Sequence, residues 1–283
     1  MESSPPKDLF APFLNSGAFM GVLLLIGRIL TTGIFVFYIL REISLIHDPG
    51  PLLYLAIAAQ VIGMVLVVLG YRTRFAAILL AACLVTTFFV FRGQLGLHNF
   101  LVTISEKVLA IVGGFLFMYA YGPGPLSLDH YRGADKPRSE AYIGPLLLTG
   151  RIFTVFVFFF FGVSKILNTP EIKAYMVRHN PHVPTNLVYL AIVTQIIPPL
   201  MVLFGYKMRY GAVALGGFCI VAPSLFHSAF GNPSEVEHFL LDFATTGGFL
   251  FMVAQGPGPL SFDARLERAG QTPARKEALS VGA

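Results

Sequence analysis

Long apolar blocks, separated by short polar or Gly/Pro-rich segments, run through the whole chain. Each block is about 18 to 25 residues long, the length of helix that crosses a hydrocarbon core of roughly 30 Å. The blocks lack the two-residue alternation of a barrel strand, and a helix satisfies its backbone hydrogen bonds within one segment. The pattern predicts an all-α fold, a polytopic membrane helical bundle, with helices at 18–41, 51–71, 74–95, 104–121, 144–167, 185–205, 209–229 and 236–255.

The chain also repeats itself. Residues 114–129 read GFLFMYAYGPGPLSLD and residues 248–263 read GFLFMVAQGPGPLSFD, so the two stretches differ at only three positions. GRILTTGIF, from residue 27, has its counterpart in GRIFTVFVF, from residue 150. Such self-similarity indicates a duplicated unit of four helices. Because four is an even number, both units enter the membrane from the same side, and we expect eight transmembrane helices as two parallel four-helix repeats.

The repeat divides the chain into domains. We expect residues 1–121 to form the first four-helix unit and residues 144–263 the second. Residues 122–143, rich in charge, Pro and Gly, are the expected cytoplasmic linker, and the polar tail 264–283 is expected to be disordered. Matching residues lie 123 positions apart in the first helix of each unit and 135 apart in the second, so the extra residues enter the loop between them.

Composition supports a membrane protein and limits its partners. Hydrophobic residues make up 55% of the chain and charged residues 12%, against about 25% charged in soluble proteins. Most Lys and Arg outside the apolar blocks lie on the side that holds both termini and the linker, so both termini are predicted to be cytoplasmic. This topology explains the net charge of +5. The lipid bilayer is therefore the expected partner, and a nucleic acid is not.

Four polar residues inside the apolar blocks are candidates for binding a ligand. Arg28 and Arg151 lie at matching depths in the first helix of each unit, and Gln60 and Gln195 in the second. A buried arginine in lipid must snorkel, find a partner or meet water. Each arginine either reaches lipid phosphate or the Asp that closes the GPGPLS(x)D stretch, or it faces a cavity and holds a quinone carbonyl or an anionic substrate. Each Gln either ties helices together or adds an amide hydrogen bond to that ligand.

A second polar cluster lies at the other end of the second unit. Its candidate catalytic residues are Lys165, His227 and Asp242, of which Asp242 interrupts the apolar run FLLDFATTGGFLFM. Glu235, Glu237 and His238 lie nearby. The cluster either relays protons to and from a reduced quinone or forms a set of interfacial salt bridges with Lys165. In the first unit, Glu106 and Lys107 occupy the equivalent region and could neutralise each other. No metal site is predicted, because no HExxH or comparable spacing is present.

Glycines and prolines add two further predictions. The pairs at 113–114, 216–217 and 247–248 should let helices approach closely. Pro198, Pro199 and Pro223 should bend or interrupt the sixth and seventh helices, and the first unit has no prolines at the matching points. This asymmetry suggests that the second unit carries a cavity.

The order of these motifs resembles the DoxX family, in a tandem version. The second unit matches through GR in its first helix, FGVSKI, LFHSAF, the GG pair and the GPGPLSFD end. The first unit keeps the GR and GG pairs but has ILREI in place of GVSKI and FVFRGQ in place of LFHSAF. DoxX-like proteins are linked to membrane oxidoreductase assemblies, and the related DoxD chain is the small membrane subunit of a thiosulfate:quinone oxidoreductase.

The resemblance implies a bacterial inner-membrane subunit of an oxidoreductase system that handles quinone or couples a partner enzyme to the quinone pool. The chain has no recognisable haem, flavin or NAD motif, so a redox cofactor would be quinone or belong to a partner subunit. The alternative is a non-catalytic membrane scaffold, or a carrier that binds a small solute or lipid without chemistry. Whether the chain is an enzyme, and whether it forms a homo-oligomer, stays open at this point.

Overall fold

The computed structural model describes residues 16–45, 50–90, 107–134, 138–226 and 233–270. The described residues are helical, with no strand among them, so the all-α prediction is confirmed. The long helices are α2 (Gly17–Leu45), α3 (Pro51–Leu69), α4 (Thr73–Val90), α6 (Val108–Tyr121), α8 (Glu140–Leu167), α10 (Leu187–Phe204), α11 (Met208–Phe226) and α12 (Pro233–Gln255). Three shorter helices are α7 (Leu128–Tyr131), α9 (Thr169–His179) and α13 (Phe262–Gly270).

Six of the long helices are long and apolar enough to cross a membrane: α2, α3, α8, α10, α11 and α12. α4 and α6 contain shorter apolar segments, Thr73–Thr87 and Val108–Tyr121. The residues between them, 91–106, lie outside the described part of the chain. The prediction of a polytopic helical membrane protein is thus confirmed. The expected disorder from residue 264 is wrong up to Gly270, because α13 forms there, and residues 271–283 lie outside the described part.

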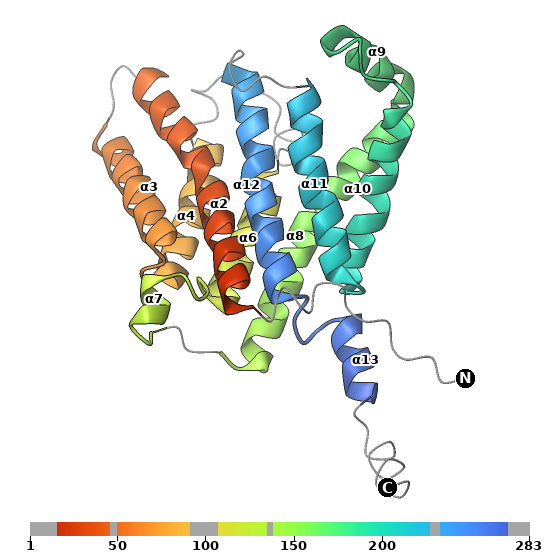
Figure 1. The fold of residues 1–283 in the computed structure, drawn as a ribbon. Coiled ribbons are helices and arrows are strands. Elements are labelled where there is room, and N and C mark those ends of the chain that lie inside the picture. Colours follow the sequence, from red (N-terminus) through yellow and green to blue (C-terminus); the bar gives the residue numbers. More distant parts are fainter. Residues whose placement is uncertain (1–15, 46–49, 91–106, 135–137, 227–232, 271–283) are drawn as a thin grey trace, which may run out of the picture.

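The hinge between the second and third helices has the same structure in both halves. α3 ends at Gly70 (φ 67°) and α10 at Gly205 (φ 63°), both left-handed. The amide after each glycine closes the turn, Tyr71 N to Leu66 O at 2.9 Å and Tyr206 N to Met201 O at 3.1 Å. Glycine adopts this conformation without strain and satisfies the last carbonyls of the helix. These hinges, α7 and α13 define one end of the bundle, called here the hinge face (Figure 1).

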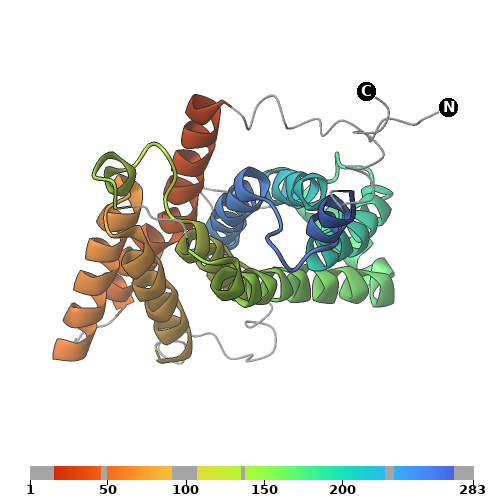
Figure 2. The same ribbon diagram turned by 90° about the horizontal axis from the view of Figure 1, so that it is seen from below.

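The helices of the two halves form two neighbouring sets that meet in the middle of the bundle (Figures 1 and 2). α2, α3, α4 and α6 pack in order, and α8, α10, α11 and α12 do the same. The two sets meet where α6 packs on α8 and α12 packs on α2, with α6 also touching α12. Each fourth helix therefore lies against the first helix of the other half. The apolar core is shared by both halves, with matching ring contacts of Phe35 with Phe115 and of Phe158 with Phe249.

Glycines make these contacts between the halves close. A Cβ added to Gly114 on α6 would lie 2.8 Å from the Cα of Gly248 on α12. One added to Gly113 would lie 2.7 Å from the carbonyl oxygen of Gly150 on α8, and α12 approaches α2 in the same way. The predicted close approach is confirmed at the glycine pairs 113–114 and 247–248. It is wrong for Gly217, where a Cβ would meet nothing within 4 Å, whereas a Cβ at Gly216 would make an ordinary contact with Phe249 on α12 at 3.5 Å.

Two features distinguish the second half. α9 occupies the loop where the sequence spacing predicted extra residues, and it lies at the end of the bundle opposite the hinge face (Figure 1). Pro198, Pro199 and Pro223 lie inside α10 and α11, and both helices continue past them. The predicted interruption of these helices is therefore wrong, since neighbouring helices in a bundle can support a proline within a helix.

Candidate ligand-binding cavity

The two intramembrane arginines are buried near the hinge face and donate hydrogen bonds to backbone carbonyls there. Arg28 is 1% exposed and Arg151 is 0% exposed. Arg28 donates from Nη2 to the carbonyl of Leu126 in the GPGP turn, and Arg151 does the same to Leu260. Arg28 also donates from Nη1 to the carbonyl of Val68, 3.2 Å away at the end of α3. A cation at the C-terminal end of a helix is favoured by the helix dipole.

The aspartates that follow these turns cap helices. Asp129 accepts hydrogen bonds from the backbone N–H groups of Arg72 and Thr73, each at 2.8 Å, at the start of α4. Asp263 accepts from Lys207 N at 2.9 Å, at the start of α11. Neither carboxylate forms an ion pair with an intramembrane arginine among the described residues. The direct Arg–Asp contact, one of the alternatives expected, is wrong, because the free amides of a helix N-terminus take the carboxylate instead; the charges of Asp129 and Asp263 still act on Arg28 and Arg151 at longer range.

A cavity of about 540 Å³ lies in the second half, where the asymmetric prolines suggested one. It is large enough for a small-molecule ligand. Its wall comes from α8, α9, α10, α11 and α12, with one residue from the start of α6. The polar groups on the wall are Lys107, Lys165, Tyr175, Thr194, Gln195, His238 and Asp242, and the rest is apolar except for backbone. Of the predicted site residues, the structure thus brings together Lys165, Gln195 and Asp242.

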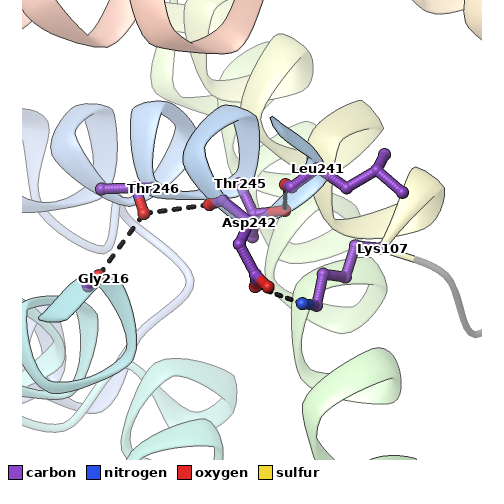
Figure 3. A network of polar contacts seen from close by, with 6 residues as sticks. All are labelled: Lys107, Gly216, Leu241, Asp242, Thr245 and Thr246. Carbon is purple, nitrogen blue, oxygen red and sulfur yellow. Dashed lines mark hydrogen bonds and ion pairs between the residues drawn. The ribbon is translucent and has the colours of Figure 1, made fainter. Parts of the chain in front are cut away.

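The acid in this wall is paired across the two halves. Asp242 is 4% exposed and forms an ion pair with the ammonium group of Lys107 (Figure 3). Lys107 precedes α6 in the left-handed conformation, with φ 60°. A salt-bridge set with Lys165 was one of the two roles predicted for this cluster, but Asp242 pairs with Lys107 instead. Lys107 satisfies the acid, and Glu106 lies outside the described residues.

Two polar groups of the wall have no partner in the described part of the chain. Lys165 makes no hydrogen bond or ion pair there, and its ammonium group lies 5.4 Å from the centre of the Phe161 ring. Gln195 is 3% exposed, and its buried Oε1 accepts no hydrogen bond. Because unpaired buried polar groups are costly, this pair is the part of the wall that most favours a bound ligand.

The same positions in the first half are closed. Glu42 and Gln60 correspond in the repeat to Lys165 and Gln195, and Thr87 corresponds to Ala222 of the cavity wall. Gln60 Nε2 donates to Glu42 Oε2 at 3.1 Å, and Thr87 Oγ1 lies 3.1 Å from Glu42 Oε1. We call Glu42, Gln60 and Thr87 the closed cluster. Gln60 therefore ties helices together, which is one of its two predicted roles.

The remaining predicted residues lie elsewhere. Arg151 is fourteen residues before Lys165 on α8, which is about 21 Å along a helix, and neither it nor Arg28 lines the cavity. His227 lies outside the described residues. Glu237 faces α2, where Arg41 Nη1 lies 2.7 Å from its Oε2. In the described ranges, no group of three or more His, Cys, Asp or Glu is placed to hold a metal ion.

The sequence did not predict the part of the cavity wall that α9 forms, nor the partner of Asp242. α9 contributes Ile172, Tyr175 and Met176 to the wall. Burial raises the pKa of the Tyr175 phenol, and the charge of Glu235 adds to the effect. The change in repeat spacing was the signal for α9. Nothing in the sequence indicated Lys107 as the partner, because the two residues lie on helices of different halves.

A bundle of apolar helices with an internal cavity defines a helical integral membrane protein with room for a small ligand. The chain belongs to the DoxX family. The DoxX profile matches residues 146–228, and the profile of the SURF4 family matches residues 10–134. Inner membrane protein YqjF of Escherichia coli (strain K12) is 30% identical over 122 residues, which are 43% of this chain and 92% of that protein.

Two further relatives are more distant. Inner membrane protein YphA of Escherichia coli (strain K12) is 24% identical over 125 residues, 42% of this chain and 89% of that protein. Surfeit locus protein 4 homolog of Drosophila melanogaster is 29% identical over 137 residues, 44% of this chain and 47% of that protein. No solved structure matches the chain. Each bacterial relative thus matches over nearly its whole length, and the match takes up less than half of this chain.

Proposed function

We propose that the chain is a membrane subunit of an oxidoreductase system and binds quinone in the second-half cavity. The observation that carries the proposal is the unpaired Lys165 and Gln195 in an otherwise apolar wall. A quinone ring has apolar faces and carbonyl oxygens that accept hydrogen bonds, and a quinol has hydroxyl groups that donate them. Lys165 can donate to a carbonyl oxygen, and Gln195 can accept from a hydroxyl group or donate to a carbonyl.

The opening of the cavity supports a ligand that is dissolved in the bilayer. Leu190 on α10 and Val221 on α11 line the cavity and are also 61% and 57% exposed. In a membrane, these exposed apolar side chains face lipid. A ligand can therefore enter between α10 and α11 and leave an apolar tail in the bilayer. This route fits a lipid-soluble quinone better than a polar solute.

The Asp242–Lys107 pair and His238 line the same space and are the groups that would exchange protons with a quinol there. His227 stays a prediction for this role. Arg28, Arg151 and Gln60 are not proposed as contacts of this quinone, because they do not line the cavity. Quinone would be the redox cofactor, and the electron donor would come from a partner oxidoreductase subunit.

The architecture behind this proposal is eight transmembrane helices in two parallel four-helix units, 1–121 and 144–263, joined by 122–143. Matching hinges, arginines, caps and glycine contacts in both halves support the duplication, as do bacterial relatives that match under half of the chain. We place the protein in a bacterial inner membrane with both termini cytoplasmic, and its relatives YqjF and YphA are inner membrane proteins. A homo-oligomer is compatible with this arrangement.

The second candidate is a non-catalytic carrier or scaffold whose cavity binds a lipid or small solute. The observation that favours it is that the Asp242 carboxylate is already held in an ion pair with Lys107. The two candidates differ in turnover. If Asp242→Asn abolishes quinone-dependent turnover in the presence of the partner enzyme, the oxidoreductase function is supported; unchanged turnover with retained binding supports the carrier.

Binding itself can be measured directly because the chain contains no Trp. Phe218 lines the cavity, so Phe218→Trp places the sole Trp fluorophore at the ligand site. Added ubiquinone or menaquinone should quench it saturably, whereas Phe156→Trp, at a position on α8 that is 52% exposed, reports only quinone in the micelle or bilayer. Equal, non-saturating quenching of both reporters would refute quinone binding in the cavity.

Two further substitutions, each combined with Phe218→Trp, test the contacts. Lys165→Met should weaken quinone binding by roughly 10-fold to 100-fold, since it removes a charge-assisted hydrogen bond worth about 1.5–3 kcal/mol. Gly217→Leu should block binding by filling the cavity, because a side chain there meets open space. Its control is Gly33→Leu, which adds the same side chain in open space on α2.

A further inference from the structure

The carboxyl group of Glu42 is buried in the membrane-embedded first half and takes no part in the cavity. It lies three residues before the end of α2, and its side chain is 0% exposed. Gln60 on α3 and Thr87 on α4, which contact it, are 0% and 3% exposed. A carboxylate in such a place is expensive unless a cation accompanies it.

No described cation accompanies Glu42. Its neighbour Arg41 points to α12, where it pairs with Glu237, and the Tyr38 hydroxyl donates to the same carboxylate at 3.2 Å. On α4, the titratable group near Glu42 is the Cys83 thiol. From α3 comes the neutral amide of Gln60. Among the described residues, the cation nearest in sequence to Glu42 thus pairs with Glu237, and no cation is seen to pair with Glu42 itself.

The geometry of the closed cluster fits a neutral carboxylic acid. Gln60 Nε2 donates to Oε2 of Glu42 at 3.1 Å. Thr87 Oγ1 lies 3.1 Å from Glu42 Oε1, a separation at which the carboxyl O–H can donate to the hydroxyl oxygen. An ionised carboxylate would have only these two donors to balance a full charge, whereas the protonated acid uses both contacts.

We propose that Glu42 is a proton-binding site of the first half and carries its proton at neutral pH when the protein is folded in the membrane. Loss of the proton to water at the nearby end of α2 would leave the carboxylate without a described counter-ion, with only the Gln60 amide and the Thr87 hydroxyl to donate hydrogen bonds to it. The second half supports a specific role for this group. At the matching position it has Lys165, so the fold does not require a carboxyl group there. The proposal is independent of quinone binding.

Infrared spectroscopy of the purified full chain tests the proposal. The wild type at neutral pH should show the carbonyl band of a protonated carboxylic acid, which shifts in D₂O and is lost completely in Glu42→Gln. Asp242→Asn is the matched control and should keep the band, because Asp242 lies outside the closed cluster and pairs with the ammonium group of Lys107. If Glu42→Gln removes no such band, or if Asp242→Asn removes it, the proposal is wrong.

Stability measurements provide a second readout. Because the folded protein keeps a proton that the unfolded chain releases above about pH 4.3, wild-type stability should fall relative to Glu42→Gln from that pH upward, through neutrality, until Glu42 ionises in the folded protein as well. Glu42→Gln keeps the shape of the neutral acid and should fold. A pH-independent difference between the two proteins would contradict the proposal. So would stabilisation of the wild type by Na⁺ but not by choline at equal ionic strength, since that result indicates a bound sodium ion instead of a proton.

Discussion

The ion pair between Asp242 and Lys107 joins the two halves, and breaking it should measurably weaken the fold. Asp242→Asn leaves the ammonium group of Lys107 unpaired, and Lys107→Met leaves the carboxylate unpaired. The Asp242 side chain is 5% exposed and the Lys107 side chain is 17% exposed. Removing one partner of a fully buried pair costs about 3–5 kcal/mol. The partial exposure of Lys107 lowers this expectation to about 2–4 kcal/mol for either variant, since solvent screens part of the interaction.

A double-mutant cycle measures the interaction itself. The variant with both substitutions has no unpaired charge, so its loss of unfolding free energy should be smaller than the sum of the single losses by about 2 kcal/mol. The assay is reversible unfolding in mixed detergent micelles, followed by helical circular dichroism. Arg41→Met on α2 and Glu237→Gln on α12 form a control cycle, which should show its own coupling but add independently to the first pair. Strict additivity of Lys107→Met and Asp242→Asn, within about 0.5 kcal/mol, would refute the cross-half pairing.

Two further predictions concern the repeated stretches. Gly114→Leu should destabilise the bundle by several kcal/mol or prevent folding, because its Cβ alone would lie 2.8 Å from the Cα of Gly248. The comparison is the thermal unfolding of Gly217→Leu, whose added side chain enters open space. Equal stability of the two variants would contradict the close crossing of α6 and α12. Asp129→Asn should cost about 0.5–2 kcal/mol by weakening the cap of α4. It should leave Phe218→Trp quenching by quinone unchanged, and a loss of quenching would show that the cap also shapes the cavity.

The sequence allowed the helices to be predicted better than their partners. Apolar length marked every long helix, because crossing lipid demands a continuous apolar segment. The glycine pair of GFLFM predicted close packing but not that α6 would lie on α8 and α12 on α2. In the same way, Asp242 was identified by being an acid in an apolar run, whereas Lys107 could not be assigned to it. Pairing between distant helices depends on the three-dimensional arrangement, which local patterns do not contain.

The error about Asp129 and Asp263 has a more specific cause. Charge complementarity alone favours pairing each aspartate with the nearest arginine. The GPGP turn instead presents a carbonyl to the arginine, and the start of the next helix presents free amides to the aspartate. Both charges thereby make hydrogen bonds to backbone groups, which are fixed in place and cost no side-chain entropy to position. A sequence motif that is repeated intact therefore marks a structural element here.

The chemistry is expected where the repeat is broken. At one matching position the first half has Glu42 and the second has Lys165, while Gln60 and Gln195 are the same residue type in both halves. Glu42 attracts the amide of Gln60 and the hydroxyl of Thr87, and the three side chains fill the space between α2, α3 and α4. Lys165 makes no hydrogen bond to Gln195 in the described structure, and Ala222 has no hydroxyl group, so the same region stays open as a cavity beneath α9. One exchange of charge, with a shortened side chain and an inserted helix, thus converts a closed polar cluster into a space for a ligand.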